Sequence, residues 1–464
     1  MMINDEVIFY TRPWFTAYYS LMASEVKHNL GCKVSFVSDY SVPGSYDLRS
    51  SAVSHHENSG DRCNDEIINP YITDIIKRDR LLRTLNRKEA ELRIHSYYSS
   101  IQNYFALRKV ACVISATVDQ YVVDLIYLYC MLNKIPFIGY HISVLPGYTL
   151  FTARGETHHY RRVDNDEIDR IIRVISDRGF RPAYIPKPNK LKIVGLKRYG
   201  RNLTRYVYYR IISLLPACKL NYHIEASLSE SRKRLSVDIL RALTWQCDKV
   251  PPDRYLYLPL QFHPECNSEY WDRNKTYEDY ENKIIRFVQV NSAHWKIVIK
   301  EHPNMLGMRL ASFYRALKKS GCQIVHASQE HRSLLRNSYA VVTLNSSAGI
   351  EGLCEGKVII CLSNPYFRSD YHLIKSPEEI INPYEIERIL YNRDAVDSLR
   401  DTVRRTLESS APIHLPDINF RTGRDPAGYG SESAKLLVQQ IPALMSAIKD
   451  AQVSAAECYT ITEE

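Results

Sequence analysis

The sequence predicts an α/β protein built from two Rossmann-like domains. Three β-rich runs, 255–260, 295–300 and 339–345, each break abruptly into turn-forming residues, and segments with helical periodicity separate them. This alternation is typical of a parallel sheet. A strand, helix, strand pattern also opens the chain. Its 464 residues, with 45% hydrophobic and 24% charged side chains, are enough for two domains with full-sized cores.

The N-terminal residues are expected to form the first domain. Residues 7–10 are predicted to be a strand, followed by an amphipathic helix over about 15–30 and a second strand over 33–37. A β-branched strand over 110–116 and a helix over about 120–133 continue the alternation. No GxGxxG motif accompanies the first strand, so nothing indicates dinucleotide binding there.

Polar residues follow two of these N-terminal strands. Arg12 and Trp14 come after the first strand, where they contact an acceptor substrate or form a capped turn with a packed tryptophan; the packed turn is the favoured interpretation. Asp119 follows the strand over 110–116. A carboxylate at the carboxyl edge of the sheet would face the acceptor, but aspartate is also among the best caps for a helix such as the one starting near Tyr121. Both interpretations of Asp119 stay open.

Residues 178–224 are strongly basic, with no acidic residue between Asp177 and Glu225 and with interleaved tyrosines. Such a stretch suits contact with an anionic membrane surface, because each cation near that surface contributes about 1 kcal/mol. The alternative is a helical connector between the domains with a solvated basic face. Nucleic acid is not an expected partner, because no RNP-like, KH-like or zinc module accompanies the charge.

The net charge bears on the partners of the protein, and its cysteine content bears on its cellular compartment. The net charge of +9 suits anionic partners such as sugar nucleotides. The 11 cysteines form no CxxC pair, which predicts buried free thiols in a reducing compartment rather than a zinc site. No secretory signal and no apolar window of roughly 18–20 residues are found. We expect a cytoplasmic protein, in solution or peripheral on the inner face of the cytoplasmic membrane.

Three polar tails follow the β-rich runs of the second domain, at 261–265, 301–303 and 345–349. Open α/β sheets bind ligands beyond the carboxyl ends of their strands. The last tail supplies hydroxyls, a glycine and the start of a helix, whose N–H groups suit a phosphate. The middle tail supplies the imidazole of His302, whose backbone Pro303 restricts. These tails are expected to converge.

The same residues resemble a known family. KEHP, followed by NSSAGIEGLCEGKVI, is similar to the C-terminal half of bacterial capsule polysaccharide glycosyltransferases of the Kdo-transferase type, the KpsC/KpsS-like family. LPLQFHPE resembles the strand-then-QPE segment of that family, although His263 stands where glutamine is expected. The resemblance implies a GT-B fold, in which two Rossmann-like domains face each other across a cleft, with a CMP-activated sugar as the donor substrate.

The resemblance also implies which residues bind the nucleotide. A leaving phosphate must be neutralised, and without a metal this falls to imidazole, hydroxyl and backbone donors. No metal and no cofactor other than the donor are expected, since no convincing DxD motif ends a strand. The alternatives are a turn histidine, helix-capping serines and a glutamate that complements a helix dipole. The nucleotide-binding positions that the resemblance implies are His302, Pro303, Asn345, Ser346 and Ser347. Gly349 and Glu351 join them as candidates because they open the following helix, and Lys300 because it lies beside His302 in sequence, where it points either to the site or to the opposite face of the sheet.

Two carboxylates are candidate catalytic residues, Glu265 and Asp119. Glu265 ends the first strand of the second domain. A carboxylate there is placed to act as the nucleophile or ion-pair partner of a retaining double displacement, or as the base that activates an acceptor hydroxyl. The alternative for Glu265 is an ordinary surface-loop glutamate.

The expected organisation has four parts: an N-terminal acceptor domain (1–177), a basic connector (178–250), a donor domain (251–385), and C-terminal helices with a tail (386–464). The expected function is transfer of Kdo or a related ulosonic acid from CMP to a growing bacterial surface polysaccharide or its glycolipid acceptor. One alternative is a polyol-phosphate transferase of the teichoic-acid type, which is expected to carry a DYSS-like turn where this chain has LNSS. Another is a catalytically silent GT-B paralogue that scaffolds an assembly complex.

Overall fold

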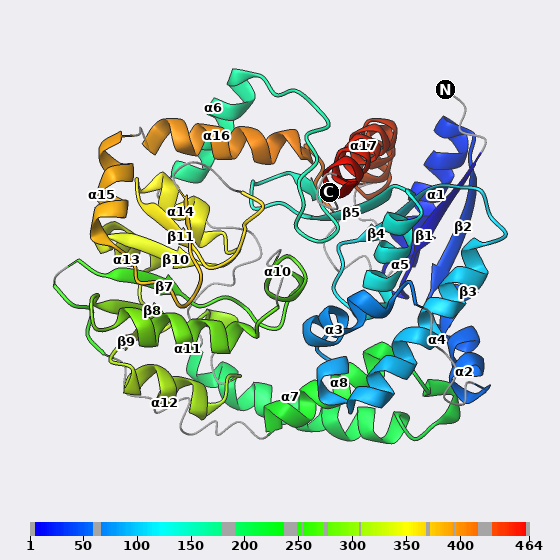
Figure 1. Cartoon of the computed structure of the whole chain (residues 1–464), viewed down its shortest axis with the longest axis horizontal. Coiled ribbons are helices and arrows are strands. Elements are labelled where there is room, and N and C mark those ends of the chain that lie inside the picture. Colours follow the sequence, from blue (N-terminus) through cyan, green and yellow to red (C-terminus); the bar gives the residue numbers. More distant parts are fainter. Residues whose placement is uncertain are drawn as a thin grey trace. The chain divides into compact units, whose positions relative to one another are not determined.

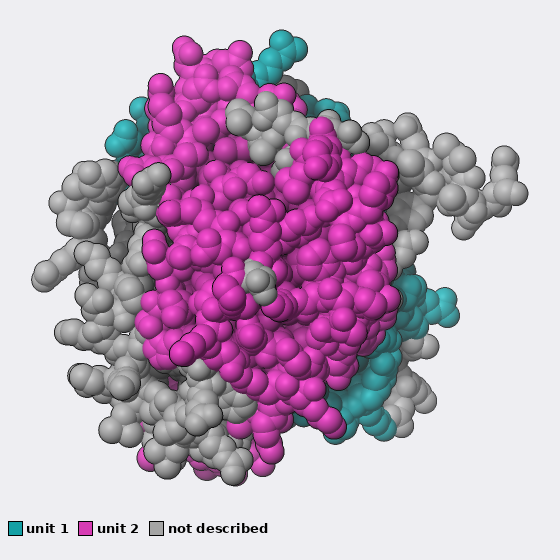
Figure 2. Space-filling model, turned by 90° about the vertical axis from the view of Figure 1, so that its left-hand side faces the viewer, with its two compact units in different colours: residues 1–163, 217–222, 406–464 teal, residues 164–216, 223–405 magenta. Residues whose placement is uncertain are grey.

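The computed structural model divides the chain into two compact units, which are described separately (Figures 1 and 2). Unit 1 comprises residues 1–163, 217–222 and 406–464, and unit 2 comprises 164–216 and 223–405. The C-terminal residues thus return to unit 1, and residues 164–177, which were expected in the first domain, belong to unit 2. The structure describes residues 5–58, 66–177, 191–235, 248–252, 254–272, 277–305, 308–367, 372–392, 395–415 and 429–460.

Unit 1 contains a sheet of order β13-β6-β5-β4-β1-β2-β3. The strands from β5 to β3 are parallel, and β6 and β13 add antiparallel pairs at one edge. The strands are β1 (Glu6–Tyr10), β2 (Lys33–Ser38), β3 (Tyr46–Asp47), β4 (Val110–Ala116), β5 (Phe137–Ile142), β6 (Thr149–Phe151) and β13 (Ser410–Ala411).

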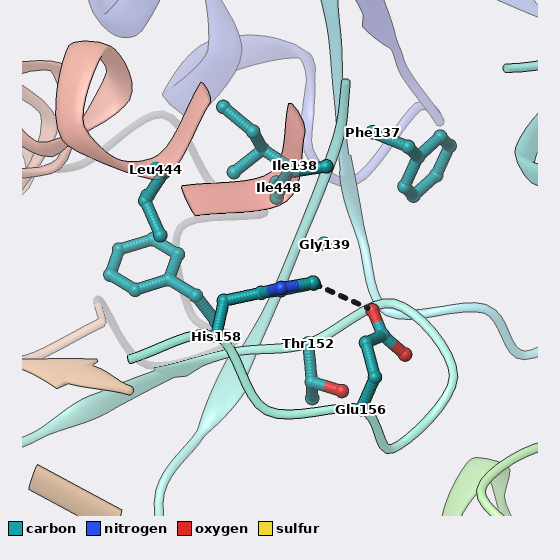
Figure 3. Close-up of a pocket in the computed structure, with 9 residues that line it drawn as sticks. Phe137, Ile138, Gly139, Thr152, Glu156, His158, Leu444 and Ile448 are labelled. Atoms are coloured by element: carbon teal, nitrogen blue, oxygen red, sulfur yellow. Dashed lines mark ion pairs between the residues drawn. The ribbon is translucent and has the colours of Figure 1, made fainter. Parts of the chain in front are cut away.

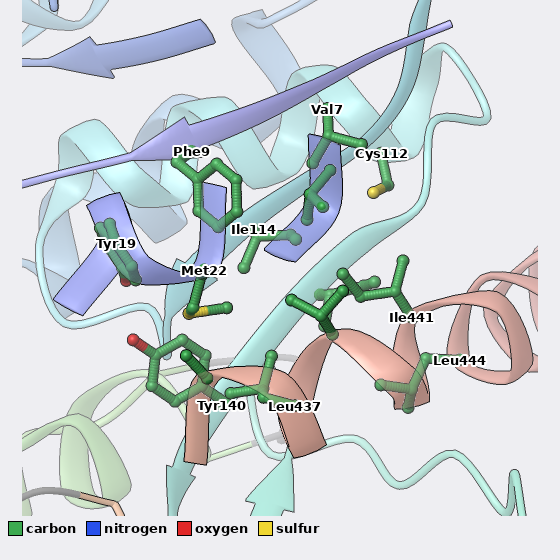
Figure 4. Close-up of a cluster of buried hydrophobic side chains, with 14 of the residues drawn as sticks. Val7, Phe9, Tyr19, Met22, Cys112, Ile114, Tyr140, Leu437, Ile441 and Leu444 are labelled. Carbon is green, nitrogen blue, oxygen red and sulfur yellow. The ribbon is translucent and has the colours of Figure 1, made fainter. Parts of the chain in front are cut away.

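Helices from both ends of the chain build the core of unit 1. Figure 4 shows Phe9 and Ile114 of the sheet packed with Met22 of α1 and with Leu437 and Ile441 of α17; all five are buried. Apolar burial of this kind stabilises the fold by about 25 cal/mol per Å² removed from water. The helices are α1 (Thr16–Leu30), α2 (Leu48–Asn58), α3 (Asn69–Arg78), η1 (Leu82–Thr84), α4 (Arg87–Phe105), α5 (Tyr121–Leu132) and α17 (Tyr429–Thr460).

Unit 2 contains a fully parallel sheet of order β12-β11-β10-β7-β8-β9. The three β-rich runs correspond to β7, β8 and β10, which lie side by side, so their carboxyl ends meet at one edge. The sequence analysis did not predict β9. The strands are β7 (Leu256–Pro259), β8 (Ile297–Lys300), β9 (Gln323–Val325), β10 (Ala340–Thr343), β11 (Val358–Cys361) and β12 (His372–Ile374).

Two glycines let α14 (Ala348–Cys354) lie close to this sheet. A Cβ atom at Gly349 would stand 2.6 Å from Phe367 Cε2, and one at Gly352 would stand 2.7 Å from Ile359 Cδ1. Both distances are too short for carbon atoms that do not move, so the turn after β10 requires glycine for packing. The other helices are α6 (Asn165–Ser176), α7 (Leu191–Ile212), η2 (Pro216–Cys218), α8 (Tyr222–Leu235), α10 (Cys266–Glu269), α11 (Tyr280–Asn291), η3 (Pro303–Met305), α12 (Ala311–Lys319), α13 (His331–Asn337), α15 (Pro383–Asn392) and α16 (Ala395–Glu408).

Two α/β units, each with a largely parallel sheet, confirm the predicted fold class, the two Rossmann-like domains of a GT-B protein. No helix in the described part of the chain combines the length and apolar composition that crossing a bilayer requires.

Candidate functional site

The tails after β7 and β10 are bonded to each other at the carboxyl edge of the unit 2 sheet. With its amide oriented to satisfy its partners, Gln261 accepts hydrogen bonds from the backbone N–H groups of Asn345 (3.2 Å) and Ser346 (2.6 Å). Asn345 in turn donates through Nδ2 to the carbonyl oxygens of Asn267 (3.2 Å) and Trp271 (3.4 Å). Asn345 therefore links α10 to the serine turn.

The tail after β8 is attached through a buried ion pair. The Glu301 carboxylate accepts hydrogen bonds from Arg309 Nε (2.9 Å) and from the Tyr314 hydroxyl (2.5 Å). Arg309 also donates to the carbonyl oxygen of Gln261, and its side chain is 0% exposed. Glu301 accepts the backbone N–H of His302 as well, at 2.6 Å. These bonds hold all three predicted tails at one edge of the sheet.

His302 takes a defined tautomer in this arrangement. Its Nδ1 accepts the backbone N–H of Asn304 at 3.1 Å, so the neutral ring carries its proton on Nε2. Phe262 packs against the ring edge-on, with 5.9 Å between the centroids. The turn-histidine interpretation is thus correct for Nδ1, and a nucleotide-binding role for the ring stays a prediction.

His331, at the start of α13, was missed by the sequence analysis. The hydroxyl of buried Tyr257 lies 2.8 Å from His331 Nδ1, and burial raises the pKa of Tyr257. Burial, assisted by the positive charges of Lys300 and Arg332, lowers the pKa of His331. The other ring nitrogen of His331, Nε2, lies 3.6 Å from Glu351 Oε2.

Glu351 has an unusual pKa for a glutamate. Burial raises the pKa of Glu351 to about 7, although Arg332, Ser347 and Lys300 oppose this rise. Ser347 Oγ donates to Glu351 Oε1 at 3.4 Å. Lys300, the last residue of β8, ends at the same edge of the sheet as the serine turn. A carboxyl group that titrates near neutral pH is suited to proton transfer.

The other predicted residues of the turn have structural contacts. Ser346 Oγ accepts the backbone N–H of Ala348 at 3.3 Å, which is the expected capping alternative. Gly349 contacts Phe367, as described above. Pro303 begins the short helix η3 directly after His302. A nucleotide-binding role for these residues stays a prediction.

Glu265 is the N-cap residue of α10 and is partly exposed. Its backbone N–H donates to Ser268 Oγ (3.2 Å), and the same hydroxyl donates to its carbonyl oxygen (3.0 Å). Ser268 Oγ also lies 3.0 Å from Nδ1 of His263, which stacks on Tyr280. Because α10 is bonded to Asn345, the backbone of Glu265 is held beside the serine turn.

In unit 1, Asp119 forms a bidentate ion pair. Arg12 donates through Nη1 to Oδ2 (2.8 Å) and through Nη2 to Oδ1 (2.5 Å). Burial alone would raise the pKa of Asp119, but attraction to Arg12 outweighs it and holds the pKa below its usual value. The proposed helix cap is wrong: the N-cap of α5 is Gln120, and the N–H of Tyr121 donates to Asp79 Oδ2 at 2.9 Å.

A second buried carboxylate lies at the same edge of unit 1. Tyr10 donates its hydroxyl to Asp39 Oδ1, and Gln120 Nε2 donates to Asp39 Oδ2 at 3.1 Å. Burial raises the pKa of Asp39 to about 6. Together with Arg12 and Asp119 it forms a polar cluster beyond the ends of β1, β2 and β4, which are neighbours in the sheet.

A small pocket in unit 1 and the potential metal ligands of the described residues add no further candidate site. The pocket lies between β5, the end of β6 with the loop that follows it, and α17 (Figure 3). Its polar groups bond within the chain: His158 Nε2 lies 3.7 Å from Glu156, whose oxygens accept the N–H groups of Ala153 and Arg154. Among the residues that the structure describes, no group of three or more His, Cys, Asp or Glu side chains is arranged to hold a metal ion.

The carboxyl edge of the unit 2 sheet carries imidazole, hydroxyl and ammonium groups, which make it a candidate site for an anionic ligand. The two Rossmann-like units together define an α/β protein of the GT-B type. Residues 261–370 match the family of capsule polysaccharide biosynthesis proteins, which confirms the resemblance found in the sequence. The match includes Gln261 at one end and extends past the serine turn. No curated protein matches the chain in sequence.

Solved structures with a similar arrangement share little sequence. KpsC from Thermosulfurimonas dismutans, a beta Kdo 2,7 transferase, is 12% identical, with a TM-score of 0.36, over 93% of this chain and 99% of that chain. A beta Kdo 2,4 transferase of the same organism covers 64% of this chain and 79% of that chain, with 12% identity and a TM-score of 0.30. The UDP-GlcNAc 2-epimerase of Methanocaldococcus jannaschii is 13% identical, with a TM-score of 0.26, over 87% and 98%.

Proposed function

We propose that this chain is a glycosyltransferase that moves Kdo or a related ulosonic acid from a CMP-activated donor to a growing bacterial surface polysaccharide or its glycolipid acceptor. The observation that carries the proposal is a coincidence of two findings. The residues that match capsule polysaccharide biosynthesis proteins, 261–370, are those that assemble Lys300, His302, Ser347 and Glu351 at one sheet edge. The family supports the class of product, and the residues support the chemistry.

In this proposal the unit 2 edge binds the phosphate of the donor. The Lys300 ammonium and His302 Nε2–H supply positive charge and a hydrogen-bond donor where the leaving phosphate gains negative charge, and the serine turn adds hydroxyl groups. Fixed donors aimed at developing charge are among the largest contributions to catalysis. The reaction then needs no metal ion for phosphate neutralisation.

The carboxylates divide the remaining tasks. Glu265, partly exposed and held beside the serine turn, is the proposed catalytic carboxylate. Glu351, with a pKa of about 7, exchanges a proton near neutral pH beside Ser347. Asp119 is unsuited to proton transfer, because Arg12 keeps it ionised. We assign the Arg12–Asp119 pair to binding of the acceptor hydroxyls.

Incubation with a CMP-Kdo donor and oligosaccharide or glycolipid acceptors tests the proposal, with release of CMP and the mass of the product as readouts. A thermal-shift series with CMP, CDP, UDP and GDP identifies the nucleotide, because a ligand that binds the native state raises its melting temperature. We expect CMP to give the largest shift. Transfer of a polyol phosphate from a CDP-linked donor would instead support the teichoic-acid-type alternative, and nucleotide binding without any transfer would support the scaffold.

A further inference from the structure

The C-terminal half of α7 and the turn that follows it carry an exposed apolar ridge. Large apolar side chains are normally buried, so a row of exposed ones on a single element indicates a contact surface. Figure 1 shows α7 as a long green helix of unit 2. The ridge consists of Leu203 (45% exposed), Val207 (49%), Tyr208 (58%), Ile211 (61%), Leu214 (70%) and Leu215 (53%).

Helical geometry places the ridge on one side. Leu203, Val207 and Ile211 are spaced by four residues, so they stack along the helix. Helical hydrogen bonds continue into the turn after α7. The N–H of Ser213 donates to the carbonyl of Tyr209 at 2.9 Å, and the N–H of Leu214 donates to the carbonyl of Ile211 at 3.2 Å. At ~100° per residue, the six side chains span an arc of about 140°.

The opposite side of α7 faces the protein. Asn202 is 7% exposed, and the Tyr209 hydroxyl lies 3.1 Å from Nε2 of His223 on α8. Arg205 packs over the ring of Tyr209, with 5.8 Å from its guanidinium to the ring centroid. The helix is therefore fixed by one face, and the ridge is the face that it leaves outward.

The ridge is bordered by positive charge. Exposed Arg210 and Arg201 lie at its two edges when the helix is viewed end-on, and no acidic residue occurs between Asp177 and Glu225. Arg234 of α8 does not add to this charge, because it forms an ion pair with Glu230 of the same helix. The exposed side of α7 thus combines apolar side chains with flanking arginines.

We propose that this ridge docks the protein on an anionic lipid bilayer, with the helix lying in the plane of the headgroups. Apolar side chains enter the boundary of the acyl chains while the flanking arginines contact the negative headgroups, which is how amphipathic basic helices bind membranes. A second copy of the chain fits less well, because a symmetric contact would bring the arginines of both copies together. The inference is independent of the transferred sugar, and its test uses no sugar donor.

Flotation of the full chain with lipid vesicles tests the inference. We expect binding to vesicles of phosphatidylcholine with phosphatidylglycerol and little binding to phosphatidylcholine alone. R201Q/R210Q removes two cations, each worth about 1 kcal/mol at an anionic surface, so the partition coefficient should fall about 30-fold. V207D/I211D should abolish binding, because it places two charges at the centre of the ridge.

A matched control separates the ridge from general surface effects. Leu107, in unit 1, is 90% exposed, so L107D places the same charge on an apolar side chain that is even more exposed than Val207 and Ile211, and it should leave vesicle binding unchanged. Sedimentation without lipid reports whether the ridge instead joins two copies. Equal binding of wild type and V207D/I211D, or a dimer that V207D/I211D converts to a monomer without any vesicle binding, would overturn the proposal. Both ridge side chains are exposed, so the variants are expected to fold, and circular dichroism verifies this.

Discussion

The carboxyl edges of the two sheets have the same topology but different electrostatics. In both units polar residues follow three neighbouring parallel strands. In unit 1 the principal charges neutralise each other, since Arg12 and Asp119 form a bidentate pair. In unit 2 the paired charges, Glu301 and Arg309, are buried, and Lys300 and His302 are the proposed phosphate-binding groups. A sheet edge whose charges are paired with each other suits the neutral hydroxyl groups of an acceptor. A sheet edge with positive charge and hydrogen-bond donors suits the phosphate of a donor substrate.

The largest effect is expected from breaking the buried pair of unit 2. Arg309→Ala leaves Glu301 buried without its partner, which costs about 3–5 kcal/mol of unfolding free energy. Chemical denaturation measures the loss. Arg336→Ala is the matched control: this arginine of α13 is 45% exposed and lies 3.6 Å from Glu355, and an exposed pair contributes at most about 1 kcal/mol. Equal losses in both variants would contradict the structural role of Arg309.

The titration of the two edges is expected to differ in pH range. A carboxyl group whose pKa is raised by folding binds more protons in the folded state, so the unfolding free energy falls as pH rises between its unfolded and folded pKa values. For Asp39 this range runs from about 3.8 to about 6, and for Glu351 from about 4.5 to about 7. One pKa unit corresponds to about 1.4 kcal/mol, so the change in unfolding free energy over the full range is about 3 kcal/mol for Asp39 and about 3.5 kcal/mol for Glu351.

Asp39→Asn and Glu351→Gln separate the two contributions. Each substitution removes one titrating group. The fall of the unfolding free energy with rising pH should therefore become less steep below about pH 6 in the first variant and below about pH 7 in the second. Denaturation midpoints at several pH values are the measurement, and the double variant should flatten both ranges. An unchanged profile for Glu351→Gln would show that the pKa of Glu351 is not raised.

The third expected effect is on turnover, through binding of the donor substrate's phosphate. His302→Ala removes the proposed phosphate donor, and loss of one such fixed donor typically lowers kcat by about 100-fold or more. The same variant should lose most of the melting-temperature shift caused by CMP. His326→Ala is the control, because this histidine follows β9 and is bonded to the exposed Ser328. Full turnover by His302→Ala would remove His302 from the proposed mechanism.

The convergence of the tails could be predicted from the sequence, but the buried contacts could not. Strand runs of four residues, such as Ile297–Lys300, are long enough to be recognised, and parallel strands bring their carboxyl ends together. His331 was missed because β9, which precedes it, has only three residues. Arg309 was missed because an arginine beside a loop is normally exposed, and its burial depends on Glu301 and Gln261, which are distant in sequence. The pairing of Asp39 with Gln120 likewise depends on a strand order that local patterns do not contain.

The smallest effect on stability, and the sharpest test of the comparison, is expected from Arg12→Lys. Lysine keeps the charge but loses the planar bidentate contact with Asp119. Arg12 is 8% exposed and Asp119 is 37% exposed, and the charge remains, so the unfolding free energy should fall by only about 1 kcal/mol, the contribution of one hydrogen bond. If unit 1 binds the acceptor, KM for the acceptor rises while the CMP-induced melting shift stays that of the wild type. A variant that loses the CMP shift and keeps its acceptor KM would reverse the assignment of the two edges.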